Sequence, residues 1–300
     1  ADAARAAASG DPRLVVVSAP PRPAGWTGKL WAMETAREAA LEQVADADFI
    51  WFADADVEHA PNALATLLGV AEAAPRRSLA SLMVRLHCAA FWERLLIPAF
   101  VYFFQMLYPF AWANDPKRRL AAAAGGSMLV RRAALEAAGG LPAISGAVID
   151  DCALARLLKP QGPTWVGLAG RSRSLRPYDG LGGIWRMVAR SAYIQLDRNP
   201  LILLGCMLGL GLVFLVPPLA AMGGAVAGDA ALALLGALAW GAMAFSLRPM
   251  QADYGLSAVW APTLPAAAAL YMAMTIDSAL RDWRGRGNAW KGRIGGGAAP

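Results

Sequence analysis

Charged side chains are almost absent from the last third of this 300-residue sequence. Residues 201–280 carry one Arg and three Asp, whereas residues 1–200 carry 22 Lys or Arg and 18 Asp or Glu. Over the whole chain, 57% of residues are hydrophobic and only 17% are charged, which is unusual for a purely soluble protein. The sequence therefore predicts a polar domain over residues 1–198, a membrane region over residues 199–280 and a basic tail over residues 281–300.

Cysteine and histidine are also scarce, and their positions disfavour a structural zinc site. Cys88, Cys152 and Cys206 form neither a CxxC pair nor a Cys/His spacing typical of zinc ligands. An odd number of scattered cysteines favours reduced thiols in a cytosolic compartment. The net charge of +6 does not indicate a nucleic-acid partner, because the basic residues cluster beside the apolar segments rather than among aromatic residues on one face.

The polar domain alternates between strand-like and helix-like segments. Strands are expected at residues 14–17, 49–52, 78–84 and 128–130, and helices at residues 29–44, 63–74 and 153–158. This alternation is typical of an α/β sheet. The chain begins at Ala1 rather than Met and reaches its first expected strand almost at once, so we expect the natural protein to begin earlier.

Four long runs carry no charge. Residues 95–113 are rich in aromatic side chains, which favours a helix lying at the membrane interface over a barely long enough span. Residues 201–227, 230–247 and 256–276 are each long enough to cross a bilayer. Because one charge at the centre of a span costs about 2.5–3.5 kcal/mol, three such runs in one third of a chain predict transmembrane helices.

The basic residues around these runs predict how the chain is oriented. Arg-rich sequence precedes the first run and follows the last, and the positive-inside rule places both flanks in the cytoplasm. Three full spans would instead place the two flanks on opposite sides of the membrane. Pro217 and Pro218 make the first run the candidate for a segment that turns back. The sequence leaves the number of crossings open.

Two carboxylates directly follow the expected strand at residues 49–52. Asp54 and Asp56 are separated by one residue and stand where open α/β sheets bind nucleotides. Such a pair can share Mg²⁺ or Mn²⁺ with pyrophosphate oxygens, and the metal would neutralise a departing diphosphate. A solvated acidic turn has the same pattern, so the triplet alone does not decide between the two interpretations.

A glycine-rich turn precedes the expected helix at residues 29–44. Gly25, Gly28 and Lys29 follow a GxxGK pattern, which lets the backbone approach an anion at a helix start. The pattern does not fit GxxxxGK[ST], so a nucleoside triphosphatase is disfavoured. An ordinary loop remains the alternative interpretation.

A second acidic pair and a second glycine pair lie further along the chain. Asp150 and Asp151 precede a helix-like segment, where a carboxylate either acts as a general base or interacts with the helix dipole. Gly125 and Gly126 precede Met128 and the strand at residues 128–130. These glycines allow either the close approach of an acceptor or a tight turn.

The order of these features resembles the family 2 glycosyltransferases. The closest resemblance is to the hopanoid-biosynthesis-associated group, with kinship to ceramide glucosyltransferases. The resemblance covers nearly the whole chain and is carried by three stretches: GWTGKLWA at residues 25–32, IDDCALA at residues 149–155, and WRGR at residues 283–286 with WKGR at residues 290–293.

The resemblance implies a Rossmann-like, glycosyltransferase A-type domain followed by transmembrane helices. It implies a divalent metal, a nucleotide-sugar donor and a lipid acceptor at a bacterial inner membrane, with the catalytic domain cytoplasmic. The implied donor-site residues are Gly25, Gly28, Lys29, Asp54, Asp56 and Arg190, with Asp56 the more direct metal ligand and Asp54 its partner. The implied base is Asp151 beside Asp150, and the implied acceptor-side residues are Gly125, Gly126 and Met128.

The chain departs from the family pattern at two places. Around Arg190 the sequence lacks the Gln or Arg and the Trp of the family's QxxRW segment, which favours a single transfer over a processive polysaccharide synthase. The family's first strand and its base-reading acidic residue are not visible here. The sequence therefore predicts an inverting glycosyltransferase, with a processive synthase and a non-catalytic membrane scaffold as alternatives.

Overall fold

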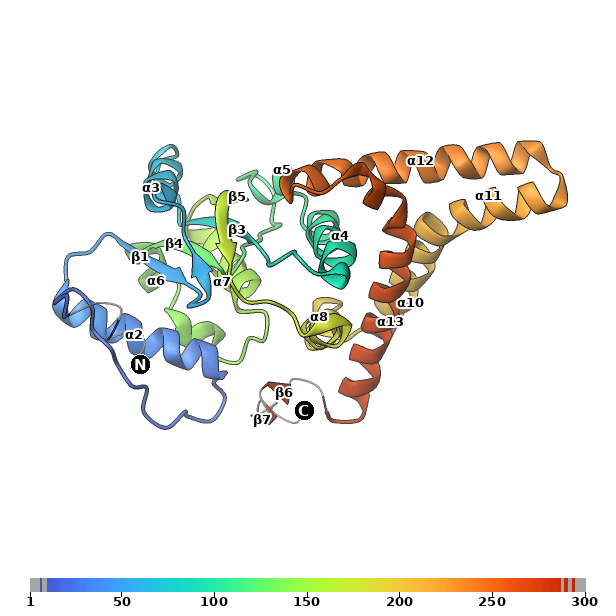
Figure 1. The fold of residues 1–300 in the computed structure, drawn as a ribbon. Coiled ribbons are helices and arrows are strands. Elements are labelled where there is room, and N and C mark those ends of the chain that lie inside the picture. Colours follow the sequence, from blue (N-terminus) through green and yellow to red (C-terminus); the bar gives the residue numbers. More distant parts are fainter. Residues whose placement is uncertain (1–5, 7–9, 287–288, 291–292, 295–300) are drawn as a thin grey trace.

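The computed structural model describes residue 6 and residues 10–286, 289–290 and 293–294. A five-stranded mixed sheet lies beside a group of apolar helices (Figure 1). Its strands are β1 (Phe49–Ala53), β2 (Val57–Glu58), β3 (Leu79–Arg85), β4 (Ser127–Arg131) and β5 (Thr164–Ser174), in the order β1-β4-β3-β5-β2. A separate pair, β6 (Ala289–Trp290) and β7 (Arg293–Ile294), lies near the C-terminus. Lys291, in the predicted basic tail, lies outside the described residues.

The strand directions create one functional edge of the sheet. β4 runs antiparallel to both β1 and β3, and β5 runs parallel to β3. The carboxyl ends of β1, β3 and β5 therefore meet at the same edge, together with the start of β4. In open α/β sheets this is the edge at which ligands bind.

Helices cover both faces of the sheet. One face packs on α2 (Gly28–Gln43), α6 (Arg132–Ala137) and α7 (Asp150–Leu158), with Leu30, Phe52 and Leu154 in the shared core. The other face packs on α3 (Ala63–Glu72), where Leu67 meets Leu82. The sheet is thus the middle layer of three, as the alternating pattern of the sequence predicts.

A second set of helices connects the sheet to the apolar part of the chain. The expected interfacial helix at residues 95–113 is two helices, α4 (Phe91–Leu107) and α5 (Phe110–Ala113), which break around Pro109. Proline cannot donate the backbone hydrogen bond that would continue α4. The short elements nearby are η1 (Leu141–Ile144), η2 (Lys159–Gln161), α8 (Gly180–Ala189) and α9 (Ala192–Gln195).

The last third of the chain is helical, as predicted. Three helical segments, Pro200–Ala227, Ala230–Asp253 and Ala258–Trp283, are long and apolar enough to cross a membrane. The first is kinked, because the π-helical segment η3 interrupts it and Pro217 and Pro218 follow. The elements are α10 (Pro200–Leu210), η3 (Gly211–Leu215), α11 (Val216–Ala227), α12 (Ala230–Asp253), η4 (Ala258–Thr263) and α13 (Leu264–Trp283).

One expected strand is wrong, and the strands β2, β5, β6 and β7 are unexpected. Residues 14–17 form no strand, and Leu14, Val15 and Val17 are exposed, because no strand in the described part of the chain pairs with them. Strand β5, which lies between β3 and β2, lacks a clear apolar alternation, since glycine and arginine interrupt it. Gly167 is required within it because a Cβ atom there would lie 2.3 Å from the ring of Trp165.

Candidate active site

Both acidic motifs lie at the carboxyl edge of the sheet. Asp54 directly follows β1, and its backbone N–H donates to the carbonyl of Gly126 just before β4. Asp150 and Asp151 occupy the first turn of α7. The two motifs are nearly a hundred residues apart in sequence, and the fold brings them to one place.

Lys29 joins the two motifs. Its Nζ atom lies 3.1 Å from Oδ1 of Asp54 and 3.0 Å from Oδ2 of Asp150. Although burial lowers the pKa of Lys29, the charges of Asp150 and Asp54 outweigh this effect and raise it above its ordinary value. The lysine is therefore a fixed positive charge between two carboxylates.

Asp151 is held by backbone donors rather than by a cation. Gly125 donates its N–H to Oδ2 at 2.9 Å, and Cys152 donates its N–H to Oδ1 at 2.7 Å. Burial, and then the neighbouring charge of Asp150, raises the pKa of Asp151 to about 6. A carboxylate of this kind is still ionised near neutral pH and is a stronger base than an ordinary aspartate.

The glycine pair before β4 allows close packing at this edge. A Cβ atom at Gly125 would lie 3.0 Å from Nζ of Lys29 and 3.5 Å from Oδ2 of Asp151. A Cβ atom at Gly126 would lie 2.6 Å from the side chain of Val84, at the end of β3. Gly126 is therefore required by its close approach to Val84, whereas a side chain at Gly125 would press on the flexible end of Lys29.

The GxxGK turn lies against the loop that leads to the second acidic pair. The N–H of Thr27 donates to the carbonyl of Ser145 at 2.8 Å, and the Thr27 hydroxyl accepts from the N–H of Leu30 as the N-cap of α2. Gly25 has a φ of +82°, a conformation that favours glycine. This cap and turn position Lys29 in the first turn of α2.

Asp56 and Arg190 are positioned by other elements. The hydroxyl of Ser174, at the end of β5, donates to Oδ2 of Asp56 at 3.2 Å. Arg190 follows α8; burial lowers the pKa of its guanidinium, and the charges of Asp150 and Asp151 act against that effect. Arg190 thus lies within electrostatic reach of the second acidic pair.

Met128 differs from the other predicted site residues. Its side chain is only 1% exposed and packs with Leu30 and Phe52 in the core under the sheet. The alternation of β4 directs it to that face, while its neighbour Ser127 accepts a hydrogen bond from Trp51 on the other face. We therefore assign Met128 to the core rather than to an acceptor contact.

A divalent cation at this edge would need ligands from a bound substrate as well as from the protein. Among the described residues, no group of three or more His, Cys, Asp and Glu side chains is arranged to hold a metal ion. Mg²⁺, however, usually takes one or two protein carboxylates and completes its shell with substrate phosphates and water. Asp54 and Asp56, which follow β1, are the carboxylates that could hold such a cation.

Sequence reasoning missed two residues that organise the site. Ser174 holds Asp56, but a single serine gives no pattern.

Glu93 is 1% exposed, and its carboxylate accepts from the N–H groups of Ala89, Ala90 and Tyr178. Burial raises the pKa of Glu93, but these backbone hydrogen bonds outweigh burial and lower the pKa to about 2. Glu93 fastens the chain after β5 to the start of α4; an acidic residue beside an apolar run was its only signal.

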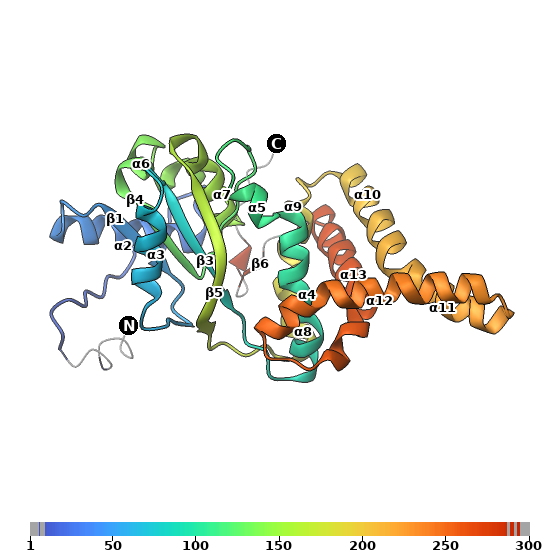
Figure 2. The same cartoon turned by 90° about the horizontal axis from the view of Figure 1, so that it is seen from above.

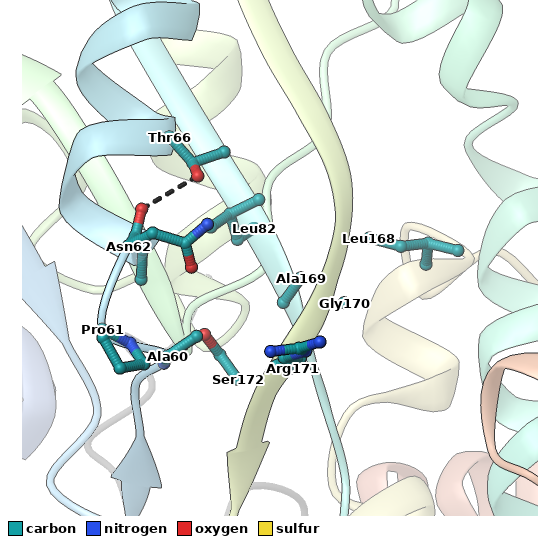
Figure 3. Close-up of a pocket in the computed structure, with 11 residues that line it drawn as sticks. Ala60, Pro61, Asn62, Thr66, Leu82, Leu168, Ala169, Gly170, Arg171 and Ser172 are labelled. Carbon is teal, nitrogen blue, oxygen red and sulfur yellow. Dashed lines mark hydrogen bonds between the residues drawn. The ribbon is translucent and has the colours of Figure 1, made fainter.

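A separate pocket of about 440 Å³ opens between the start of α3 and the middle of β5 (Figure 3). Asn62, Thr66, Leu82 and Arg171 are among its lining residues. It includes none of the predicted site residues, so we do not assign the donor or the acceptor to it.

A family model described as glycosyl transferase family 21 matches residues 27–296. This family is ceramide glucosyltransferase-like, which agrees with the kinship expected from the sequence. The matching family is family 21, whereas the sequence patterns led us to expect family 2. No curated protein matches the chain.

Proposed function

Because this chain belongs to glycosyl transferase family 21 and is a glycosyltransferase, we propose that it moves a sugar from a nucleotide diphosphate to a lipid acceptor at a membrane, with inversion. The observation that carries the proposal is the bridge formed by Lys29 between Asp54 and Asp150. A donor held beside Asp54 and an acceptor beside Asp151 would then occupy one cleft.

Donor binding is assigned to the GxxGK turn and the first acidic motif. Lys29 and the first turn of α2 present positive charge toward the carboxyl edge of the sheet, which favours a diphosphate. Asp56, oriented by Ser174, and Asp54 would hold a divalent cation. When bound, that cation supplies charge neutralisation for the departing diphosphate. Arg190, which follows α8, adds a second positive charge near Asp150 and Asp151.

Proton removal from the acceptor is assigned to Asp151. Its carboxylate is fixed by the N–H groups of Gly125 and Cys152, so it does not need to reorganise during the reaction. The acceptor hydroxyl loses its proton to Asp151 and attacks the anomeric carbon on the face opposite the diphosphate. The bond to the diphosphate breaks as the new glycosidic bond forms.

The acceptor is proposed to be amphiphilic. Binding a soluble sugar acceptor would not need three long apolar helical segments and the aromatic helix α4, whereas a lipid acceptor lies in the membrane that they fit. By the resemblance of the sequence, a hopanoid or another polyisoprenoid lipid is the proposed class. Family membership removes the non-catalytic scaffold, and the missing Gln or Arg and Trp around Arg190 argue against a processive synthase.

We expect the full-length protein to transfer a radiolabelled sugar from a nucleotide diphosphate sugar into the lipid-extractable fraction. Membranes that contain the protein would be incubated with uridine diphosphate sugars and Mn²⁺, and the products analysed by mass spectrometry. The expected product carries one sugar per lipid. Long glycan chains would favour the processive synthase, and label in water-soluble products only would contradict a lipid acceptor.

The acid limb of the pH profile should report Asp151. Because the raised pKa of Asp151 lies at about 6, its basic form is lost as the pH falls through that value, and kcat/KM should fall about tenfold per pH unit below it. The charge of Lys29 lowers the pKa of Asp151, so Lys29→Gln should move the midpoint to higher pH. The exposed Lys117→Gln is the matched control and should leave the midpoint unchanged. A wild-type profile that stays flat down to pH 5 would contradict this assignment.

A further inference from the structure

The three apolar helical segments do not lie parallel to one another. In Figures 1 and 2, α11 and α12 form a hairpin that projects away from the sheet. Helix α13 instead runs along the side of the apolar part that faces the sheet, next to α4 and α8. Burial differs in the same way. In the most apolar stretch of each segment, 39% of Ala258–Trp283 is buried, against 11% of Pro200–Ala227 and 17% of Ala230–Asp253.

The hairpin is closely packed along its length. A Cβ atom at Gly224 would lie 2.4 Å from the backbone nitrogen of Ala233, and one at Gly236 would lie 2.3 Å from that of Ala221. Small residues that let helix backbones approach in this way are typical of helix pairs in lipid. Gly228, with a φ of +74°, ends α11, and Asp229 caps α12 by accepting from the N–H of Leu232.

The outer surface of the hairpin matches a bilayer in polarity and length. Residues 211–227 and residues 230–247 carry no charge, and at 1.5 Å per residue α11 is about 18 Å long and the charge-free part of α12 about 27 Å. The second arm is near the ~30 Å hydrocarbon thickness of a bilayer, and η3 extends the charge-free length of the first. Asp229 stands at the tip and Arg248 at the base of the second arm. Large apolar side chains face outward: Leu212, Val213, Val216, Leu219, Met222, Val226, Leu232, Leu234, Leu235, Leu238 and Phe245.

The segment after the hairpin returns to the catalytic domain. Arg85, at the end of β3, forms a two-point ion pair with Asp253, and the hydroxyl of Tyr254 accepts from the N–H of Leu86. The ring of Trp260 then packs on the ring of Phe91, the first residue of α4. The chain that leaves the hairpin is therefore back beside the sheet before α13 begins.

The far end of α13 is also attached to the catalytic side. Trp185 of α8 donates to Asp277 at 2.6 Å, and the N–H of Tyr193 in α9 donates to the hydroxyl of Ser278. Arg198 forms an ion pair with Asp282 at 3.1 Å. Between these ends, the hydroxyl of Tyr271 donates to the carbonyl of Leu96 in α4. Helix α13 is thus held at both ends and in the middle by helices of the catalytic side.

We infer that the protein crosses the bilayer only twice, through the α11–α12 hairpin, and that α13 lies along the membrane face of the catalytic domain. This inference is independent of the proposed reaction. It assigns the lipid bilayer as the occupant of the hairpin surface. It also removes the conflict in the charge pattern, because two crossings place the Arg-rich sequences before α10 and after α13 on the same side.

An arrangement in which α13 stands upright in the membrane conflicts with its contacts. Since α4, α8 and α9 lie along α13, that arrangement would bring them to the depth of the bilayer core. The charged Glu93, three residues before Leu96 on α4, would then stand near that depth as well, because Leu96 contacts Tyr271 in the middle of α13. Charges at that depth are costly, so the hairpin and not α13 is the part that fits hydrocarbon.

Thiol labelling in intact cells that produce the full-length protein tests this topology. Ala230→Cys places a thiol at the hairpin tip without removing the Asp229 cap, and Ala227→Cys places a second one across the turn. Arg286→Cys and Arg284→Cys place thiols after α13, at exposed positions. A large maleimide that does not cross membranes would be added before or after permeabilisation, and the gain in mass per chain compared with that of the natural chain and its three cysteines.

The tip variants should gain one label in intact cells, and the variants after α13 should gain theirs only after permeabilisation. Labelling of Arg286→Cys and Arg284→Cys in intact cells would overturn the inference, because α13 would then be a third crossing. Protection of both tip variants in intact cells, with labelling after permeabilisation, would also overturn it, because the hairpin would not reach the far side.

Discussion

Replacing Asp151 by Asn should lower kcat/KM for sugar transfer by about 10²- to 10⁴-fold, the range typical for loss of a general base. The amide has nearly the shape of the carboxylate and retains an oxygen that accepts the N–H of Gly125 or of Cys152. It cannot take a proton from an acceptor hydroxyl. The measurement is the initial rate of transfer to lipid by the full-length protein, at saturating and at limiting acceptor.

Asp46→Asn is the matched control for this substitution. Asp46 is exposed in the turn before β1, at the end of the strand opposite to Asp54, and its replacement should leave transfer unchanged. The thermal unfolding midpoint of Asp151→Asn should stay close to that of the natural protein or rise, because a buried charge is removed. Undiminished turnover by a folded Asp151→Asn protein would exclude Asp151 as the base.

Replacing Asp56 by Asn should make sugar transfer depend on much higher concentrations of divalent cation. The apparent dissociation constant for Mn²⁺ or Mg²⁺ should rise at least about 10- to 100-fold, the range found when even a supporting group of a metal site is removed. The physical reason is that the neutral amide of Asn binds a hard cation less strongly than a carboxylate. The assay is a titration of Mn²⁺ into chelator-treated membranes that contain the protein.

Glu58→Gln provides the comparison for Asp56→Asn. Glu58 lies two residues further along, and its exposed carboxylate pairs with Arg173. This variant should require the same Mn²⁺ concentration as the natural protein. If the chelator leaves transfer by the natural protein intact, the assignment of Asp54 and Asp56 to a cation is wrong, while the assignment of Asp151 is unaffected.

Several local elements were predictable from the sequence. The helix expected at residues 29–44 is α2 (Gly28–Gln43), and the strand expected at residues 78–84 is β3 (Leu79–Arg85). Strand β3 is buried on both faces, which its short, largely apolar run indicates, whereas α2 buries only Leu30 and Glu34 and is indicated by residues that favour helix. The apolar run at residues 14–17 is just as strand-like, but a strand also needs a partner, and its composition does not reveal whether one exists.

Long-range pairing was not predictable from residue patterns. Strand β5 stands between β3 and β2, yet Gly167 and Gly170 interrupt its pattern, because the fold places the ring of Trp165 over Gly167. The number of membrane crossings was also not predictable, because the run at residues 256–276 has the length and polarity of a transmembrane helix. Only the contacts of α13 with α4, α8 and α9 distinguish it from the hairpin.

The residues of the candidate site were predicted individually, but the contacts between them were not. Asp54 and Asp151 were each singled out, but each had a competing interpretation as a turn or a helix start. The ion pairs of Lys29 connect residues that are 25 and 121 positions away in sequence, and no local pattern encodes such a contact. Ser174 and Glu93 were missed because the partners that give them a role are distant in sequence.

The central claim is that donor and acceptor bind together in one cleft, so that the acceptor oxygen displaces the diphosphate in a single step. The most direct measurement is the anomeric configuration of the sugar in the purified lipid product, read from its proton NMR coupling constant and compared with that of the donor. Single displacement predicts the opposite configuration. A product with the donor's configuration would contradict the account, because two successive displacements or a front-face reaction would then be required.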